Sequence, residues 1–431
     1  MNIIQLTPGA GDMYCGNCLR DNALATELYR QGHSVCMVPL YLPLTLDEED
    51  QSANTPVFFG GINVYMQQKT SLWNFLPRPI RKLFDTKFVL RWIGEKAAKT
   101  NPSQLGDITI SMLKGENGKQ KSSLIELKNW LISEQKPDVL VFSNALLLGM
   151  HGMLKNELKA KTVCMLSGED WFLDGLHEPY YTQAWEMVAQ HARQVDLLIA
   201  PSRHYADYMA GRLNLPKERI LVIPNGLNTA GYENQESGET ESKKDLVLGY
   251  FARMSQAKGV DILVDAYIKI RERGHFPNLK LKIGGGVSGW NELLVFVLTK
   301  KLELGGYGED VSFHPNVGRN EKIQMLKSLD LFCVPALDNE SFGLYAIEAL
   351  AAGVPVLLPN RAAFPEIVNT SGAGRLYEPD SDPKNLDSLV EAIENMLSDE
   401  TARRQYRLSA KKSVAEHYLI ETMAKRFCEM V

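Results

Sequence analysis

The sequence predicts an α/β protein with two domains, each built on a parallel sheet flanked by helices. Short apolar segments alternate with helical patterns twice along the chain, a pattern typical of strands buried on both faces of a sheet. A polar, breaker-rich stretch at 233–245 separates the two series. The chain of 431 residues is also longer than one hydrophobic core usually serves. We therefore expect two Rossmann-like domains that face a central cleft.

The expected strands are short apolar runs bounded by glycine, proline or polar residues. In the first series they are Asn2–Leu6, Ser34–Val38, Val139–Ser143, Thr162–Leu166, Leu197–Ala200 and Ile220–Ile223. In the second series they are Leu246–Phe251, Leu279–Ile283, Val311–His314, Leu331–Val334 and Val354–Leu358. A glycine-rich turn at Pro8–Gly11 and a helical pattern that stops at Gly32 join the first two strands into a βαβ unit.

Composition narrows the classes of partner and compartment. Lys and Arg total 47 against 52 acidic residues, and the net charge of −5 gives no reason to expect a nucleic acid partner. No apolar run approaches the ~18 residues of a membrane span, and an apolar strand stands where a secretory leader would be basic. Six cysteines are too few for a disulfide scaffold. The sequence therefore favours a cytoplasmic protein.

Residues 44–130 do not follow the alternation and are expected to form a helical insertion in the first domain. Between 69 and 99 there are eight Lys or Arg residues against two acidic ones. A basic surface of this kind is one way to contact a membrane peripherally, but Lys87 and Arg91 fall on an apolar helical face. Two interpretations stay open, a peripheral membrane contact and a partly buried helical insertion.

The most informative motif is the segment Asp338–Glu348, which lies between an apolar strand and a helical pattern. Glu340 and Glu348 project on the same side of the expected helix. The free backbone N–H groups at the start of that helix favour a phosphate group, and Glu348 suits the hydroxyls of a ribose. We interpret the segment as a site for a nucleoside diphosphate sugar. The alternative is a pair of solvated carboxylates on an amphipathic helix.

Two cations follow the first strand of the second series. Arg253 and Lys258 come directly after Leu246–Phe251, at the carboxyl end of a parallel strand, where open α/β sheets bind ligands. Fixed cations at this edge can neutralise the negative charge that grows on a departing diphosphate. Either cation alone is also compatible with an ordinary solvated surface.

Together these segments resemble the family 4 glycosyltransferases of the GT-B fold. The resemblance rests on Asn225-Gly226, Arg253, Lys258-Gly259, Gly284-Gly285-Gly286 and the E-x7-E segment that continues to Val356, and it covers about 195–400. It implies a retaining transferase that moves a sugar from a nucleoside diphosphate donor without a metal or other cofactor. It further implies that Arg253 and Lys258 contact the diphosphate, Glu348 the ribose and Glu340 the sugar.

The resemblance also implies the remaining site residues. The expected donor-binding residues are Gly16, Asn225, Gly226, Gly284, Gly285, Ser341, Phe342, Gly343, Leu344 and Glu348. From the two series of strands and the polar stretch between them, we expect an acceptor-side domain at 1–228, a linker at 229–245 and a donor-binding domain at 246–419. The resemblance implies that a last helix at 420–431 returns to the first domain.

The chain departs from the family pattern on the acceptor side. Ser167-Gly168-Glu169-Asp170 stands where family members commonly carry a cleft histidine. Asn144, Glu169 and Asp170 are therefore our acceptor-side candidates. Cys15-Gly16 replaces a Gly-Gly pair, and Ala362-Ala363 stands where many members have glycines.

Two further motifs have simple explanations. Cys15 and Cys18 form a C-x-x-C pair, which occurs in redox modules and in zinc sites, but no second pair completes a zinc site. We interpret them as small residues lining a tight loop. Asp380-Ser381-Asp382 resembles a metal-binding D-x-D but lies in a Pro-flanked loop, and is interpreted as a turn. No metal is expected.

Two other functions stay open at this stage. One is a catalytically lapsed protein that only binds a sugar nucleotide, and the other is an epimerase or hydrolase acting on the sugar nucleotide itself. The donor base, the sugar, the acceptor and the oligomeric state are not determined by the sequence.

Overall fold

The structure is a computed structural model and describes residues 1–9, 16–44, 46, 48–52, 55–59, 105–233, 245–289, 291–382 and 385–431. The described residues form two compact units: unit 1 is Met1–Gly226 with Ile420–Val431, and unit 2 is Leu227–Leu419. The basic stretch 69–99 and Cys15 lie outside the described residues. Within the described ranges, no helix is long and apolar enough to cross a membrane.

Unit 1 is built on a six-stranded parallel sheet with the strand order β2-β1-β3-β4-β5-β6. Its strands are β1 Asn2–Thr7, β2 Ser34–Pro39, β3 Val139–Phe142, β4 Lys161–Met165, β5 Leu197–Ala200 and β6 Ile220–Val222. Its helices are α1 Gly16–Arg30, α5 Gly106–Leu113, α6 Lys121–Trp130, α7 His151–Leu158, α8 Glu169–Asp174, α9 Tyr180–Ala192, α10 Arg203–Leu213 and α18 Ile420–Met430. Short helical turns lie at η3 Gly115–Asn117, η4 Leu131–Gln135, η5 Ala145–Met150 and η6 Lys217–Arg219.

Alternate residues of the unit 1 strands serve two different cores. Ile4 of β1 lies opposite Leu140 of β3 and joins the core on the face covered by α5 to α10. Its neighbour Ile3 points the other way and packs with residues of α1 and α18. Because successive strand residues point to opposite faces, a strand covered on both sides is apolar throughout.

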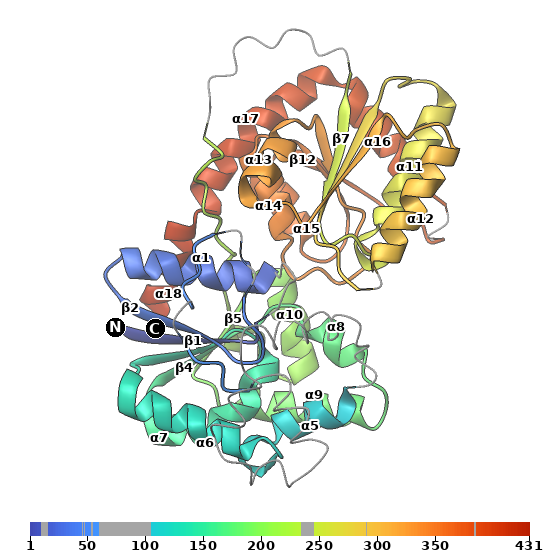
Figure 1. The fold of residues 1–431 in the computed structure, drawn as a ribbon. Helices are drawn as coiled ribbons and strands as arrows, with labels where there is room; N and C mark the ends of the chain where they lie inside the picture. Colours follow the sequence, from blue (N-terminus) through green and yellow to red (C-terminus); the bar gives the residue numbers. More distant parts are fainter. Residues whose placement is uncertain are drawn as a thin grey trace. The chain divides into compact units, whose positions relative to one another are not determined.

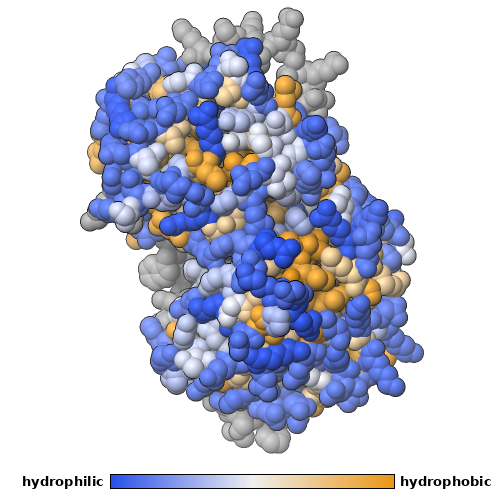
Figure 2. All heavy atoms as spheres, turned by 180° about the vertical axis from the view of Figure 1, so that it is seen from behind, coloured by the Kyte–Doolittle hydropathy of each residue, from blue (hydrophilic) through white to orange (hydrophobic). Residues whose placement is uncertain are grey.

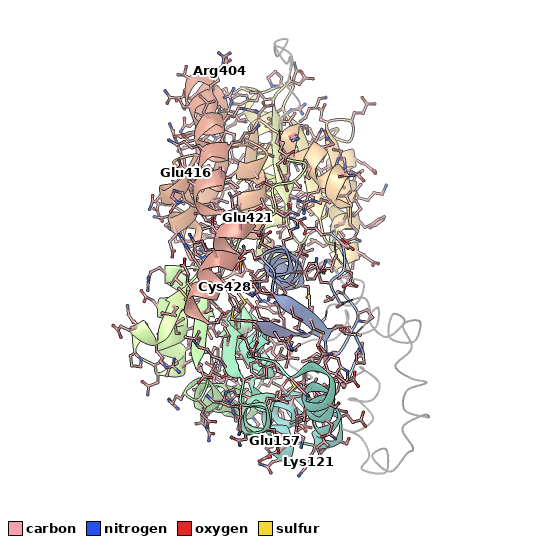
Figure 3. All side chains as sticks on the ribbon, turned by 90° about the vertical axis from the view of Figure 1, so that its left-hand side faces the viewer. Lys121, Glu157, Arg404, Glu416, Glu421 and Cys428 are labelled. Carbon is pink, nitrogen blue, oxygen red and sulfur yellow. The ribbon has the colours of Figure 1, made fainter. Side chains whose placement is uncertain are left out.

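The last helix of the chain belongs to unit 1. Phe427 of α18 is fully buried in the same core as Leu24 of α1. Figure 3 marks α18 by Glu421 and Cys428 and shows it beside α1. The helix therefore completes the cover on one face of the first sheet.

Unit 2 is built on a second six-stranded parallel sheet, with the order β12-β11-β10-β7-β8-β9. Its strands are β7 Val247–Phe251, β8 Lys280–Gly285, β9 Val311–Pro315, β10 Leu331–Cys333, β11 Val356–Pro359 and β12 Gly374–Tyr377. Its helices are α11 Val260–Arg273, α12 Asn291–Leu304, α13 Arg319–Lys327, α14 Leu344–Ala351, α15 Phe364–Ser371, α16 Asp387–Ser398 and α17 Glu400–His417, with a short turn η7 Gln256–Lys258.

Two six-stranded parallel sheets flanked by helices confirm the predicted fold class (Figure 1). Hydrophilic residues cover most of the face drawn in Figure 2, as expected for the outer helices of such units. Every expected strand is present. β12 was not predicted, because Gly374–Tyr377 is short and only its last residue is buried.

The carboxyl ends of β7 and β8 approach each other closely. Ala252 N donates to Gly284 O at 3.2 Å, and Met254 N donates to Gly286 O at 2.9 Å. Gly285 lies between these two bonds with a φ of +129°, and a Cβ atom there would lie 1.8 Å from Ala252 O. The neighbouring Gly286 has open space around its Cβ position and no positive φ. Of Gly285 and Gly286, Gly285 is therefore the one that the backbone requires to be glycine.

We expect Gly285→Ala to lower the free energy of unfolding by about 3 kcal/mol, because alanine adds both a steric clash and a disfavoured φ. Gly286→Ala is the matched control and should stay within about 0.5 kcal/mol of the wild type. Denaturant unfolding followed by circular dichroism measures both. Equal stability of the two variants would contradict the close approach.

Candidate functional site

The turn after β7 lies directly against the loop after β10. Gly259 has a φ of +69°, and a Cβ atom there would lie 2.1 Å from Pro335 O. Leu337 N donates to Ala257 O at 2.9 Å. These contacts bring Lys258, at the end of the turn, to the segment that the sequence analysis singled out at 338–348.

Lys258 is held between two carboxylates. Its Nζ lies 2.6 Å from Glu340 Oε2 and 2.7 Å from Asp338 Oδ2. The hydroxyl of Tyr345 donates to Glu340 Oε2 at 2.8 Å. The two motifs predicted separately from the sequence therefore meet in one cluster, and Asp338 joins them as a second carboxylate.

Burial opposes the charged form of each group in this cluster, and neighbouring charges and hydrogen bonds outweigh burial for two of the three pKa values. Burial alone would lower the pKa of Lys258, yet the charges of Glu340 and Asp338 outweigh it and raise that pKa. Burial would raise the pKa of Glu340, yet the ammonium of Lys258 and hydrogen bonds from Lys258 and Tyr345 lower it. For Asp338, burial dominates and the nearby charge of Glu340 adds to it, so its pKa is raised despite Lys258. Lys258 and Glu340 therefore remain ionised at neutral pH.

Arg253 is a second cation at this edge, with different surroundings. The hydroxyl of Tyr250 donates to Arg253 O at 2.8 Å, which anchors the backbone directly after β7. The side chain of Arg253 is exposed, and its guanidinium forms no ion pair or hydrogen bond with any residue that the structure describes. Its charge is thus available to a ligand.

The start of α14 lies beside this cluster. Gly343 caps the helix with a φ of +90°, and Ala363 N donates to Glu340 O at 3.3 Å. Ala362 adopts a φ of +52°, a conformation that suits glycine, where many family members have one. The first N–H groups of α14 lack partners within the helix, and an anion is favoured there. The predicted residues Ser341, Phe342, Gly343 and Leu344 form this helix start.

Glu348 lies one turn further along α14 and is paired. Lys322 of α13 approaches Glu348 Oε1 with its Nζ at 2.6 Å, and both residues are buried. Lys322 was not predicted from the sequence as a site residue. A signal was present, because Lys322 precedes Leu326 by four residues on the apolar face of α13, and a charge on such a face needs a buried partner.

The other predicted donor residues lie at the end of β8, at the end of the main segment of unit 1 and at the start of α1. Gly284 and Gly285 end β8, next to the turn that carries Arg253. Asn225 and Gly226 end the main segment of unit 1, and Asn225 Oδ1 is enclosed without a hydrogen-bond partner among the described residues. Gly16 begins α1. The structure thus gathers the predicted unit 2 residues at the carboxyl edge of one sheet.

The acceptor-side candidates lie at the carboxyl edge of the unit 1 sheet and are bonded within it. Glu169 accepts from Ala145 N at 2.8 Å and from Ser167 N at 2.5 Å. Tyr205 places its hydroxyl 3.0 Å from Glu169 and 2.8 Å from Asp170. Burial raises the pKa of Glu169.

Asn144 caps the η5 turn by accepting from Leu146 N at 3.1 Å. The hydrogen bonds of Glu169 with Ala145, Ser167 and Tyr205 hold the ends of β3 and β4 to α10. A role of Asn144, Glu169 and Asp170 in acceptor binding stays a prediction.

The structure describes Cys18 of the C-x-x-C pair and the D-x-D motif at 380–382. Cys18 is buried in α1, while its predicted neighbour Cys15 lies outside the described residues, so the C-x-x-C alternatives stay open. Asp380 accepts a hydrogen bond from Ser388 Oγ at 3.0 Å, close to the start of α16. Within the described part of the chain, no group of three or more His, Cys, Asp or Glu side chains is placed to hold a metal ion.

Two family models match the chain. Residues 232–413 match the model described as glycosyl transferases group 1, and residues 109–230 match the model described as glycosyltransferase family 4. An uncharacterized glycosyltransferase of Methanocaldococcus jannaschii is 28% identical over 53% of this chain and 57% of its own length. A D-inositol 3-phosphate glycosyltransferase of Actinosynnema mirum is 30% identical over 43% of this chain and 46% of its own length. The chain thus spans about half the length of the curated relatives it matches.

Solved structures show the same fold over the whole chain. A sucrose-phosphate synthase of Thermosynechococcus elongatus superposes with a TM-score of 0.71 and 15% identity, covering 99% of this chain and 97% of that one. The Anabaena protein HepE, crystallised with UDP and glucose, superposes with a TM-score of 0.66 and 16% identity, covering 100% of this chain and 98% of that one. The chain therefore carries the domains of the group 1 and family 4 glycosyltransferases on a GT-B fold.

Proposed function

We propose that the protein is a retaining glycosyltransferase that moves a sugar from a nucleoside diphosphate to the hydroxyl of a glycan, lipid or small-molecule acceptor. The observation that carries this proposal is the ionised pair of Lys258 and Glu340 beside the exposed Arg253 and the start of α14. Open α/β sheets bind ligands at this edge. The two curated relatives described above carry glycosyltransferase names, which support the same reaction class.

The proposed reaction breaks the bond between the anomeric carbon of the sugar and the oxygen of the β-phosphate. Negative charge then develops on the diphosphate, and Arg253, Lys258 and the first N–H groups of α14 compensate it. The acceptor oxygen bonds to the anomeric carbon on the same face, and its proton passes to the departing diphosphate. The resemblance to family 4 implies that this retaining transfer needs no metal.

The two cations are expected to act differently because their surroundings differ. Lys258 is already compensated by Asp338 and Glu340, so a diphosphate competes with these carboxylates for its N–H groups. The guanidinium of Arg253 forms no ion pair or hydrogen bond with a described residue, although its charge lowers the pKa of Asp338, and it supplies the first attraction for the anion. Glu340 is then released from Lys258 and faces the sugar, on which positive charge develops.

Incubation with UDP-, GDP- and ADP-sugars in the presence of glycan and lipid extracts tests the reaction class. A transferase produces a glycosylated acceptor in step with free nucleoside diphosphate. Binding of a sugar nucleotide without any product would indicate a lapsed enzyme. A changed or freed sugar without a glycosylated acceptor would indicate an epimerase or hydrolase. Either of these results would contradict the proposal.

Removing either cation should slow transfer strongly. We expect Arg253→Ala and Lys258→Ala each to lower kcat/KM by roughly a hundredfold, about 3 kcal/mol, because each loses one preorganised charge on the leaving group. Lys280→Ala is the matched control, since it removes a cation from the opposite, amino edge of the same sheet. Melting temperatures monitor folding, and a chelator should leave the wild-type rate unchanged. Full activity in both cation variants, or loss of activity with chelator, would refute the assignment.

The two glutamates should show different kinetic effects. Glu348→Gln is expected to raise the donor KM by about tenfold with little change in kcat, because a ribose contact is present in both ground and transition states. Glu340→Gln should instead lower kcat by about a hundredfold, since its charge opposes the positive charge that develops on the sugar. Steady-state kinetics of both variants with one accepted donor measure kcat and the donor KM and so show whether the two roles differ. Identical kinetic changes in the two variants would speak against separate roles.

A further inference from the structure

The most deeply buried ion pair in the described part of unit 2 joins α13 to α14. The side chains of Lys322 and Glu348 are only 5% and 9% exposed, and Lys322 Nζ lies 2.6 Å from Glu348 Oε1. Glu348 is the residue expected to contact the donor ribose. The pair therefore raises the question of what Lys322 does for that contact.

Burial makes Glu348 dependent on its partner. A buried carboxylate is strongly disfavoured unless an opposite charge or hydrogen bonds compensate it. Lys322 supplies both, because its ammonium donates a charge-assisted hydrogen bond to Oε1. Without Lys322, the carboxylate loses the hydrogen bond that holds Oε1 and is free to turn away from the interior. The hydrogen-bond acceptor that Glu348 offers to a ligand would then change its position.

The geometry leaves half of the carboxylate for a ligand. Lys322 occupies Oε1, while Oε2 accepts no hydrogen bond from any residue that the structure describes. Both side chains project from regular helices, α13 and α14, so their backbones are fixed by the packing of unit 2. A carboxylate held at one oxygen has a defined orientation for the other.

We propose that Lys322 is a positioning residue for the donor nucleotide. It holds Glu348 at Oε1 and fixes its side chain so that Oε2 accepts hydrogen bonds from the ribose hydroxyls. This inference rests on the proposed function, because it concerns the ribose of the same donor. A purely structural pair that only links two helices would affect stability and all nucleotides alike.

The discriminating quantity is the preference for an intact ribose. Calorimetry with UDP, GDP and ADP first identifies the nucleoside diphosphate that the wild type binds most tightly. The same measurement with its 2′-deoxy and 3′-deoxy analogues gives the factor lost with each hydroxyl. We expect the wild type to lose about tenfold or more for at least one analogue, the size of a hydrogen bond to a charged group.

Lys322→Met should bind the intact nucleotide about tenfold more weakly and reduce the analogue preference to less than about threefold. Glu348→Gln should show the same reduced preference, and the double variant should be no worse than Glu348→Gln alone. Arg271→Met is the control, because it breaks an ion pair with Asp310 at 2.7 Å at the amino edge of the sheet and should keep the wild-type preference.

The double variant guards against a single variant that fails to fold, because it removes both charges of the Lys322–Glu348 pair together. A wild-type ribose preference in Lys322→Met, or in the double variant, would overturn the proposal. Equal weakening of all nucleotides in Lys322→Met would also overturn it. Failure of the wild type to bind UDP, GDP or ADP at all would instead contradict the proposed function, and this inference with it.

Discussion

The contact between the turn after β7 and the loop after β10 is the constraint on which the site depends. Gly259 has no side chain, and this allows its backbone to pass the carbonyl oxygen of Pro335 at a distance that any Cβ atom would forbid. The contact brings Lys258 to Glu340, although the two are 82 residues apart in the chain. A larger residue at 259 would separate the cation from the segment that begins α14.

The charges at this edge are arranged in two different ways. Lys258 and Lys322 each form an ion pair with a glutamate of the 340–348 segment, whereas Arg253 forms no ion pair with a described residue. A buried charge with a partner costs far less than one without, and the pair holds its geometry, whereas an exposed cation attracts an anion from solution. The same short segment thus orients two carboxylates, one near the proposed sugar and one near the proposed ribose, through two lysines from different elements.

Local patterns predicted most of the framework. Apolar runs at regular intervals identified eleven of the twelve strands, because a strand buried on both faces is apolar at every position. β12 lies at the edge of its sheet, and its partly exposed Gly374–Tyr377 lacks that pattern. Glu340, Lys258 and Arg253 were identified because each follows a strand at the edge where ligands bind.

The sequence alone did not predict which distant residues pair with each other. Spacing along the chain reports which residues share a helix face, but not which helix faces another. Lys322 was therefore missed as the partner of Glu348, and Asp338 as the second partner of Lys258. On the acceptor side, Glu169 follows a strand as a functional residue would, yet its oxygens accept backbone N–H groups of Ala145 and Ser167.

A crystal structure of the protein with a bound nucleoside diphosphate sugar would show whether the cluster around Lys258 holds the donor. We expect the diphosphate between Arg253 and the first turn of α14, with Lys258 Nζ donating to a phosphate oxygen instead of Glu340. We also expect the sugar beside Glu340. A diphosphate bound elsewhere, with Lys258 still paired with both Asp338 and Glu340, would rule out this donor site.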